Sequence, residues 1–293
     1  MSKFRVVPAL VLIGLAALLA ACGGSDSGSS SAAADSTAAS SAAADTCAKD
    51  QLALKNAGQL TIGTDKPAYP PYFEDDDPSN GKGFESAVAY AIAKQLGFTT
   101  DEVKWVVVPF DSSYAPGDKT FDFDVNQISI TDARKKVVDF SMPYYTAPQA
   151  IIVAKGSPFE GKTTLADFQS AVIGVQVGTT SLDATTSQIM PSAEPKVFNN
   201  SNDVVAAFKQ KQVDAIVTDL PTALYLTAAV LDNAVVAGQF NAPGGDQWGA
   251  LLQKGSALTP CVDKALETMT TDGTLGDLTM TWMAEQAGAP ELK

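Results

Sequence analysis

Short β-branched runs alternate with helical patterns along most of this 293-residue chain, and this alternation limits the fold more than any other feature. Each run is apolar and stops at a proline or at a turn rich in small and polar residues, which is typical of buried strands. The sequence therefore predicts strands at 60–63, 103–108, 150–154, 172–177 and 213–217, and another that ends at Ile128.

Helical patterns fill the gaps between these runs. Apolar residues recur every fourth position from Phe84 to Leu96, and Gly97 is placed to end that helix. Further helices are predicted at 203–211 and from near Pro221, Pro260 and Gly276. Repeated strand–helix–strand units favour an α/β fold in which helices cover both faces of doubly wound parallel sheets.

Polar residues lie just past several predicted strand ends: Asp65, Ser129, Thr180 and Asp219. Ligands of open α/β sheets bind at the carboxyl ends of the strands. These four side chains are therefore candidates for one binding site.

The N-terminus has the pattern of an export signal. Lys3 and Arg5 precede an apolar stretch at 6–19, which is too short to span a bilayer. The sequence Leu-Ala-Ala-Cys at 19–22 resembles a bacterial lipobox, which would make 1–21 a signal peptide and Cys22 the lipidated first residue. The alternative is an uncleaved anchor with an incidental cysteine. Small and polar residues dominate the rest of 22–46, so we expect a flexible, disordered linker there.

Composition excludes several classes of function. The net charge of −13 argues against nucleic acid as a partner, because phosphate binding needs a basic face. The chain has no histidine, so a Ser-His-Asp triad and the common zinc sites are excluded. Neither a metal nor a cofactor is expected. If Cys22 carries lipid, then Cys47 and Cys261 remain; in an oxidising compartment they form a disulfide, or else they are two free thiols.

One arginine has an unusual local position. Thr131 is a good helix N-cap, which puts Arg134 in the first turn of a short predicted helix, where the macrodipole disfavours a cation. A bound carboxylate would offset this, because guanidinium binds carboxylate with two hydrogen bonds. The alternative is a surface arginine in a poor but tolerated position.

Five segments carry a family resemblance: SITDAR with VVDFSMPYY (129–145), LTIGTDKPAYPPY (60–72), GKGFESAVAYAIAKQLG (81–97), IGVQVGTTS (173–181) and VDAIVTDLPTA (213–223). In this order they resemble the family 3 periplasmic-type solute-binding proteins, the polar amino acid receptors of ABC importers. The resemblance covers most of the chain from about Leu60. It implies a type II periplasmic-binding-protein fold, with two α/β lobes joined by two hinge crossings near 147–150 and 246–249.

The implied lobes follow from these crossings. The first lobe comprises 47–147 and a C-terminal return at 247–293, and the second comprises 148–246. Between them the resemblance implies a ligand held by both lobes, whose binding favours the closed state.

The resemblance also implies roles for particular residues. Arg134 would bind the carboxylate of a free amino acid, with donors from Thr179 and Thr180. Asp219 would take the ammonium, together with the Ser129 hydroxyl and a carbonyl near Gln127; capping of the following helix is the alternative for Asp219. Asp65, Tyr69 and Phe110 match positions around the ligand side chain, and a core position is the alternative for Phe110. Asn126 and Gln127 replace residues that are often small in relatives, so they shorten the side-chain pocket or bind a polar side chain.

The sequence thus predicts a monomeric, lipid-anchored receptor outside the cell membrane, periplasmic or on its outer face. It would capture a polar amino acid for an ABC permease and its ATPase. One alternative is an enzyme of the same fold, similar to cyclohexadienyl or arogenate dehydratase. Another is a sensory lipoprotein.

Overall fold

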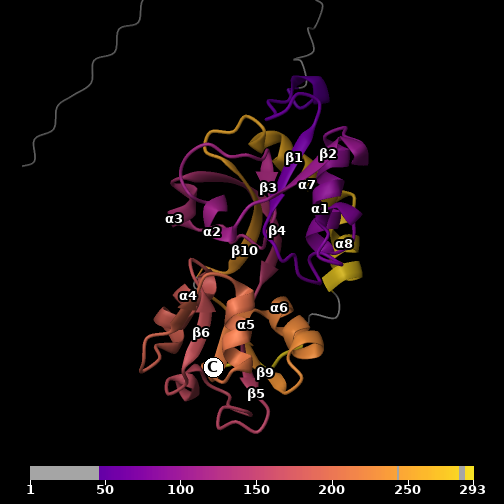
Figure 1. Ribbon diagram of the computed structural model, residues 1–293. Helices are drawn as coiled ribbons and strands as arrows, with labels where there is room; N and C mark the ends of the chain where they lie inside the picture. Colours follow the sequence, from indigo (N-terminus) through magenta and orange to yellow (C-terminus); the bar gives the residue numbers. More distant parts are fainter. Residues whose placement is uncertain (1–45, 243, 284–287) are drawn as a thin grey trace, which may run out of the picture. The chain divides into compact units, whose positions relative to one another are not determined.

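The computed structural model describes residues 46–242, 244–283 and 288–293, which belong to one compact unit spanning 45–293 (Figure 1). The predicted signal peptide, Cys22 and all but the last residue of the predicted linker lie outside these residues. Within the described ranges, no helix combines the length and apolar character needed to cross a bilayer.

The secondary structure consists of ten strands and eight α-helices in the described residues. The strands are β1 Leu60–Thr64, β2 Val103–Val107, β3 Phe123–Asp124, β4 Val138–Ala147, β5 Gln149–Ala154, β6 Ile173–Gln176, β7 Lys196–Phe198, β8 Ala215–Asp219, β9 Ala234–Phe240 and β10 Asp246–Gln253. The helices are α1 Phe84–Gln95, α2 Phe110–Ser113, α3 Asp132–Lys135, α4 Thr180–Ala184, α5 Ser201–Lys209, α6 Leu220–Tyr225, α7 Thr259–Thr271 and α8 Thr274–Met283.

The strands form two five-stranded sheets, one in each lobe (Figure 1). The first has the order β2-β1-β3-β10-β4, and the second has the order β7-β6-β8-β5-β9. The predicted α/β class and the two lobes are confirmed, but the sheets are not wholly parallel. β10 runs antiparallel to β3 and β4, and β5 runs antiparallel to β8 and β9. The long strand β4 had no clear alternating pattern, since its buried positions recur every third residue and not every second.

Several local predictions are confirmed by the backbone. α1 ends at Gln95, and Gly97 follows with a left-handed φ of 84°, a conformation that glycine adopts without strain. Thr131 caps α3, because its side chain accepts a hydrogen bond from the Arg134 N–H. The predicted strand before Ile128 is present as β3, but its predicted end is wrong, because β3 stops at Asp124. Gln127 has a left-handed φ of 49°, and its N–H bonds to Glu85 in place of a ladder partner.

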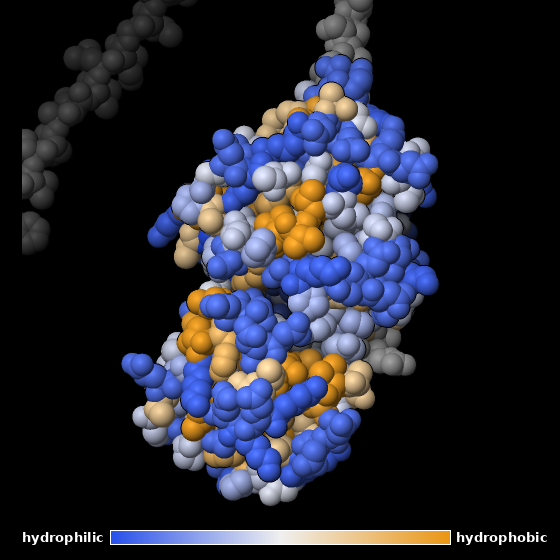
Figure 2. Space-filling model, viewed as in Figure 1, coloured by the Kyte–Doolittle hydropathy of each residue, from blue (hydrophilic) through white to orange (hydrophobic). Residues whose placement is uncertain are grey.

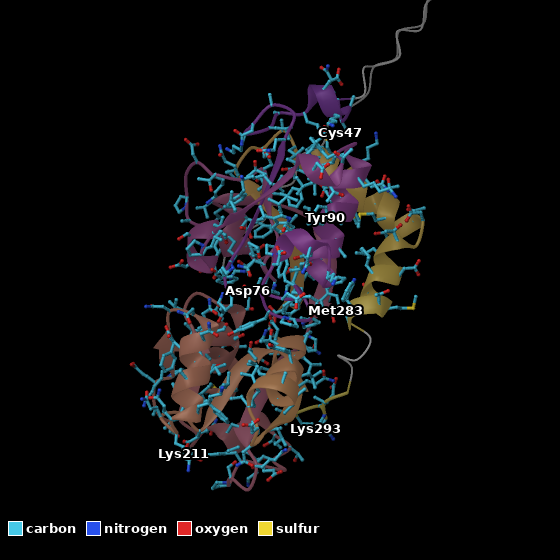
Figure 3. All side chains as sticks on the ribbon, turned by 45° about the vertical axis from the view of Figure 1, so that its right-hand side comes forward. Cys47, Asp76, Tyr90, Lys211, Met283 and Lys293 are labelled. Carbon is cyan, nitrogen blue, oxygen red and sulfur yellow. A yellow bond between two sulfur atoms is a disulfide. The ribbon has the colours of Figure 1, made fainter. Side chains whose placement is uncertain are left out.

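The chain crosses between the lobes at Pro148, the one residue between β4 and β5, within the predicted range. It returns between Phe240 and Asp246, just before the predicted second crossing. The last residues go back to the second lobe, although the whole of 247–293 was expected in the first. Glu291 pairs with Gln239 of β9, and the Leu165 N–H bonds to the Lys293 carbonyl. Figure 3 shows Met283 beside the first lobe and Lys293 on the second.

Each lobe has its own apolar core. In the first lobe, α1 and α7 pack on the sheet around buried residues such as Phe84, Ile92 and Leu266. In the second, separate clusters cover the two faces of the sheet. The predicted disulfide joins Cys47 to Cys261 of α7, with the two Cα atoms 5.3 Å apart. It attaches the segment before β1 to the C-terminal part of the first lobe.

Candidate functional site

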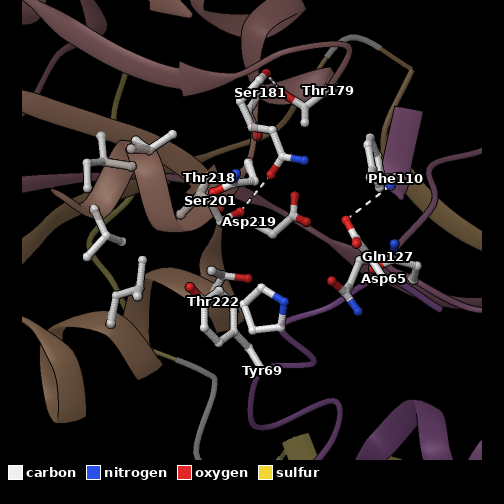
Figure 4. Close-up of a pocket in the computed structure, with 18 of the residues that line it drawn as sticks. Asp65, Tyr69, Phe110, Gln127, Thr179, Ser181, Ser201, Thr218, Asp219 and Thr222 are labelled. Carbon is white, nitrogen blue, oxygen red and sulfur yellow. Dashed lines mark hydrogen bonds between the residues drawn. The ribbon is translucent and has the colours of Figure 1, made fainter. Parts of the chain in front are cut away.

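A cavity of about 100 Å³ lies between the two lobes, where both sheets present the carboxyl ends of parallel strands. Figure 2 shows the recess between the lobes on a mainly hydrophilic face, and Figure 4 shows the side chains around it. Since one water needs roughly 10–15 Å³ by this measure, the volume suits a small ligand. Eight of the nine predicted ligand-binding residues line it: Asp65, Tyr69, Phe110, Gln127, Ser129, Thr179, Thr180 and Asp219.

Asp65 is held at the end of β1 by two backbone donors. Its Oδ1 accepts from the Lys66 N–H at 2.6 Å, and its Oδ2 accepts from the Phe110 N–H at 3.0 Å, as Figure 4 shows for Phe110. Burial raises the pKa of the Asp65 carboxyl despite these bonds. Phe110 thus has two roles: its side chain lines the cavity wall, and its backbone N–H holds the Asp65 carboxylate. This cavity position replaces the ordinary core position that was the alternative for Phe110.

Gln127 is held in place by hydrogen bonds to Glu85, a fully buried residue of α1. The Glu85 carboxylate accepts hydrogen bonds from the Gln127 N–H, the Gln127 side-chain amide and the Tyr144 hydroxyl. Burial raises the pKa of Glu85 to about 7, although these bonds lower it. Glu85 therefore holds the loop that leads to Ser129. Sequence reasoning missed this role, because the contact joins positions 42 residues apart.

Arg134 is buried at the edge of the cavity, with 7% of its surface exposed, but it is not among the residues that line it. Its guanidinium donates to the Ser129 carbonyl at 2.7 Å and, across the lobes, to the Gly178 carbonyl at 2.9 Å. The Phe110 and Tyr114 rings flank it, with centroids 5.4 and 4.6 Å from Cζ. The surface alternative for Arg134 is therefore wrong, and burial lowers its pKa.

The opposite wall begins with the threonines that start α4. The Thr179 side chain caps this helix by accepting from the Leu182 N–H at 3.2 Å. The Thr180 and Ser129 hydroxyls lie 3.3 Å apart across the cavity. Other contacts also join the lobes, including Tyr72 to Thr222 at 3.0 Å. The two walls are thus in direct contact around the cavity.

Asp219 ends β8, and its side chain forms no cap bond with α6, which removes the capping alternative. Instead, the Gln149 amide donates to Asp219 at 2.6 Å and to Asp246 at 2.7 Å. The Ser181 hydroxyl in turn donates to the Gln149 carbonyl oxygen. Burial and then the adjacent Asp246 carboxylate raise the pKa of Asp219 to about 8. Sequence reasoning missed Gln149, Asp246 and Ser181. Gln149 and Asp246 come together only where the two crossings meet in the folded chain.

The raised pKa values of Glu85 and Asp219 predict the pH dependence of stability in the ligand-free protein. The folded state keeps these protons to about pH 7 and 8, whereas the unfolded carboxyls lose theirs near 4.5 and 3.8. The stability that these two groups contribute is therefore fully present below their unfolded pKa values and is lost as the pH rises through their folded pKa values. We expect urea denaturation to give a falling free energy of unfolding between pH 5 and 8.

The expected size follows from the same values. At about 1.36 kcal/mol per pKa unit, Glu85 alone corresponds to roughly 3 kcal/mol. The matched variant Glu85→Gln cannot titrate and should lose that part of the slope. Stability that rises over this range in the unsubstituted protein would contradict the assignment.

The site's chemistry is that of binding a small charged molecule. The described residues hold no group of three or more side chains arranged to ligate a metal. They place one buried cation on the first lobe, and near the second lobe's wall a half-buried carboxylate, Asp219, beside a buried one, Asp246, with hydroxyl and amide groups between them.

Comparison with known proteins gives consistent matches. Residues 60–285 match the model for bacterial extracellular solute-binding proteins, family 3. The L-cystine-binding protein TcyJ of Escherichia coli (strain K12) is 30% identical over 234 residues, covering 78% of this chain and 84% of that protein. A solved ancestral arginine-binding protein bound to glutamine is 32% identical with a TM-score of 0.66, covering 77% of this chain and 98% of its own.

A third match is the solved ancestral amino acid-binding protein AncCDT-1, a precursor of cyclohexadienyl dehydratase. It is 33% identical with a TM-score of 0.64, covering 77% of this chain and 95% of its own. The fold is that of type II periplasmic binding proteins. Since the family model spans well over half of the sequence, this chain belongs to the family 3 bacterial extracellular solute-binding proteins.

Proposed function

We propose that this protein captures a polar amino acid as a zwitterion between its two lobes and delivers it to an ABC permease. The observation that carries the proposal is the placement of Arg134 and Asp219 on opposite lobes beside one cavity. A free amino acid has a carboxylate and an ammonium on one carbon. Burying either of them without a partner is costly, so the site must supply both signs of charge.

The carboxylate end is assigned to Arg134. Its two hydrogen bonds to Ser129 and Gly178 engage two of the five N–H donors of the guanidinium. The planar fork can bind a carboxylate with two parallel bonds. Ser129 and Thr180, whose hydroxyls face each other, both line the cavity and supply further donors.

The ammonium end is assigned to Asp219. The raised pKa of this carboxyl reflects burial and its neighbour Asp246 without a positive partner of comparable strength. An ammonium would favour the ionised form, because an opposite charge nearby stabilises the charged state of an acid. Gln149 already orients Asp219 through its hydrogen bond.

Both ends are available together only while the lobes are closed. A ligand that contacts both lobes therefore shifts the population toward that state. A permease that recognises the closed form would then receive loaded protein. The lipid on Cys22 would keep the protein at the outer face of the cell membrane, and membrane fractionation of a Cys22→Ser variant tests that anchor.

A thermal-shift screen against the common L-amino acids tests the proposed function. A ligand present at about 1,000 times its Kd should stabilise the folded state by about 4 kcal/mol, and so raise Tm. The methyl ester and the N-acetyl form of the responding amino acid are matched controls, because each lacks one of the two charges. Neither should shift Tm. A protein whose Tm is unchanged by every amino acid, or raised equally by both blocked forms, does not bind a zwitterion here.

The similarity to a dehydratase precursor favours one second candidate, a dehydratase activity at the same site. Asp65 and Asp219 are the carboxyl groups on the cavity wall that could move a proton. Incubation of the protein with prephenate or arogenate, followed by detection of the aromatic product, decides between turnover and binding alone.

A further inference from the structure

Buried polar atoms without a hydrogen-bond partner gather where β1 and β3 end beneath the cavity. Within the described residues, they include the Thr64 hydroxyl, both carboxylate oxygens of Asp124 and the Nδ2 of Asn126. These side chains are 2%, 0% and 8% exposed. Leaving such groups unpaired costs free energy, so several in one place indicate a partner that is not part of the chain.

Asp124 is seated against the backbone of the neighbouring strand. It pairs in register with Gly63 of β1, and any Cβ at position 63 would clash with its carboxylate. Gly63 therefore leaves the room that this acid occupies. Asp65 and Asn126 each follow two residues after this pair, and both line the cavity. The backbone thus places Asp124 near two residues of the cavity wall, although its own side chain does not line the cavity.

Three carboxyl groups share this region. Burial, followed by the charges of Glu85 and Asp65, raises the pKa of Asp124 well above its usual range. The one basic group that acts on it is Lys119, which is buried and donates to the Ala115 carbonyl. None of the ion pairs found among the described residues joins Lys119 to Asp124. Burial disfavours the ionised form of Asp124, and a cation brought close to it would favour that form. Arg134 cannot supply this charge, because the ligand carboxylate would occupy it.

We propose that Asp124 is a specificity residue that selects amino acids with a positively charged side chain. The inference rests on the proposed function, since it assumes that Arg134 and Asp219 hold the ligand's main-chain charges. The distal cation then lies against Asp65 and Asn126, with Asp124 as the buried counter-charge behind them. A carboxylate side chain is rejected, because it would bring another acid to a place that already holds three carboxyl groups.

Calorimetry with the full chain tests this selection through one pair of ligands. L-arginine and L-citrulline have nearly the same shape, but only arginine carries a side-chain charge. We expect arginine to bind at least tenfold more tightly than citrulline, and L-glutamate to give no measurable binding. If the full chain binds citrulline or L-glutamine as tightly as arginine, the inference is overturned while the proposed function stands. Binding of none of these amino acids removes the inference, and the thermal-shift screen of the other amino acids then decides the proposed function separately.

The variant Asp124→Asn assigns the effect to this residue. It should reduce the arginine-to-citrulline ratio toward one and leave citrulline affinity within about twofold. Asp118→Asn makes the same charge change at an exposed position on the preceding loop and should keep the ratio. A ratio that is unchanged in Asp124→Asn overturns the role of Asp124. If that variant does not fold, the arginine–citrulline comparison in the unsubstituted protein still decides the inference.

Discussion

Replacing Arg134 with alanine should weaken amino acid binding by about 2–5 kcal/mol, or roughly 30-fold to several thousandfold in Kd. The substitution removes the cation assigned to the ligand carboxylate, which would then be buried without a partner. It also leaves the Ser129 and Gly178 carbonyls without their donor, so the closed state loses a contact between the lobes. Isothermal calorimetry with the amino acid identified by thermal shift measures the change.

Two further variants make this result specific. Lys135→Ala removes a neighbouring exposed charge from the same helix and should leave Kd unchanged. Arg134→Lys keeps the charge but not the planar fork, so it should recover only part of the affinity. Unaltered affinity in Arg134→Ala, with circular dichroism like that of the parent, would exclude Arg134 from the site.

Reduction of the Cys47–Cys261 bond should lower the free energy of unfolding by about 2–5 kcal/mol. The two cysteines are 214 residues apart, so the closed loop is long and the effect should lie toward the upper end of that range. The bond also attaches the segment before β1 to α7, and loss of this attachment frees an edge of the first lobe. Urea denaturation with and without reductant measures the difference.

The double variant Cys47→Ser/Cys261→Ser is the control, because its unfolding midpoint should not respond to reductant. In a Cys22→Ser background, the native oxidised protein should also show no reaction with a thiol reagent. Equal midpoints before and after reduction, or rapid labelling of both cysteines, would rule out a stabilising disulfide.

The parts of the site that were predictable from sequence follow from local rules. Asp65, Thr180 and Asp219 were placed by the rule that ligands collect at the carboxyl ends of strands, and all three line the cavity. Thr131 was recognised as a cap from its type and position, and its bond to the Arg134 N–H is present. Such patterns involve only a few neighbouring residues, so they can be recognised without knowledge of the tertiary fold.

The parts that were missed depend on contacts between distant segments. Gln149 and Asp246 are 97 residues apart, and they meet because β4 and β10 pair beside both crossings. No pattern around either residue indicates that pairing. The sequence around Glu85 and Asp124 predicts an ordinary helix and an ordinary strand. The role of these residues depends on their burial near the cavity, which the periodicity of the sequence does not indicate. Only the register of β1 with β3 brings Asp124 against Gly63.

The return of the C-terminal residues to the second lobe also limits how far the protein can open. Met283 packs in the core of the first lobe, and Ala289 packs against a core cluster of the second. Six residue steps separate them, so their Cα atoms cannot be more than roughly 22 Å apart. If the lobes opened farther than this length permits, the backbone hydrogen bonds of Pro290 and Leu292 with Gln239 would have to break. The entrance available to an arriving solute is therefore limited partly by the length of chain between Met283 and Ala289.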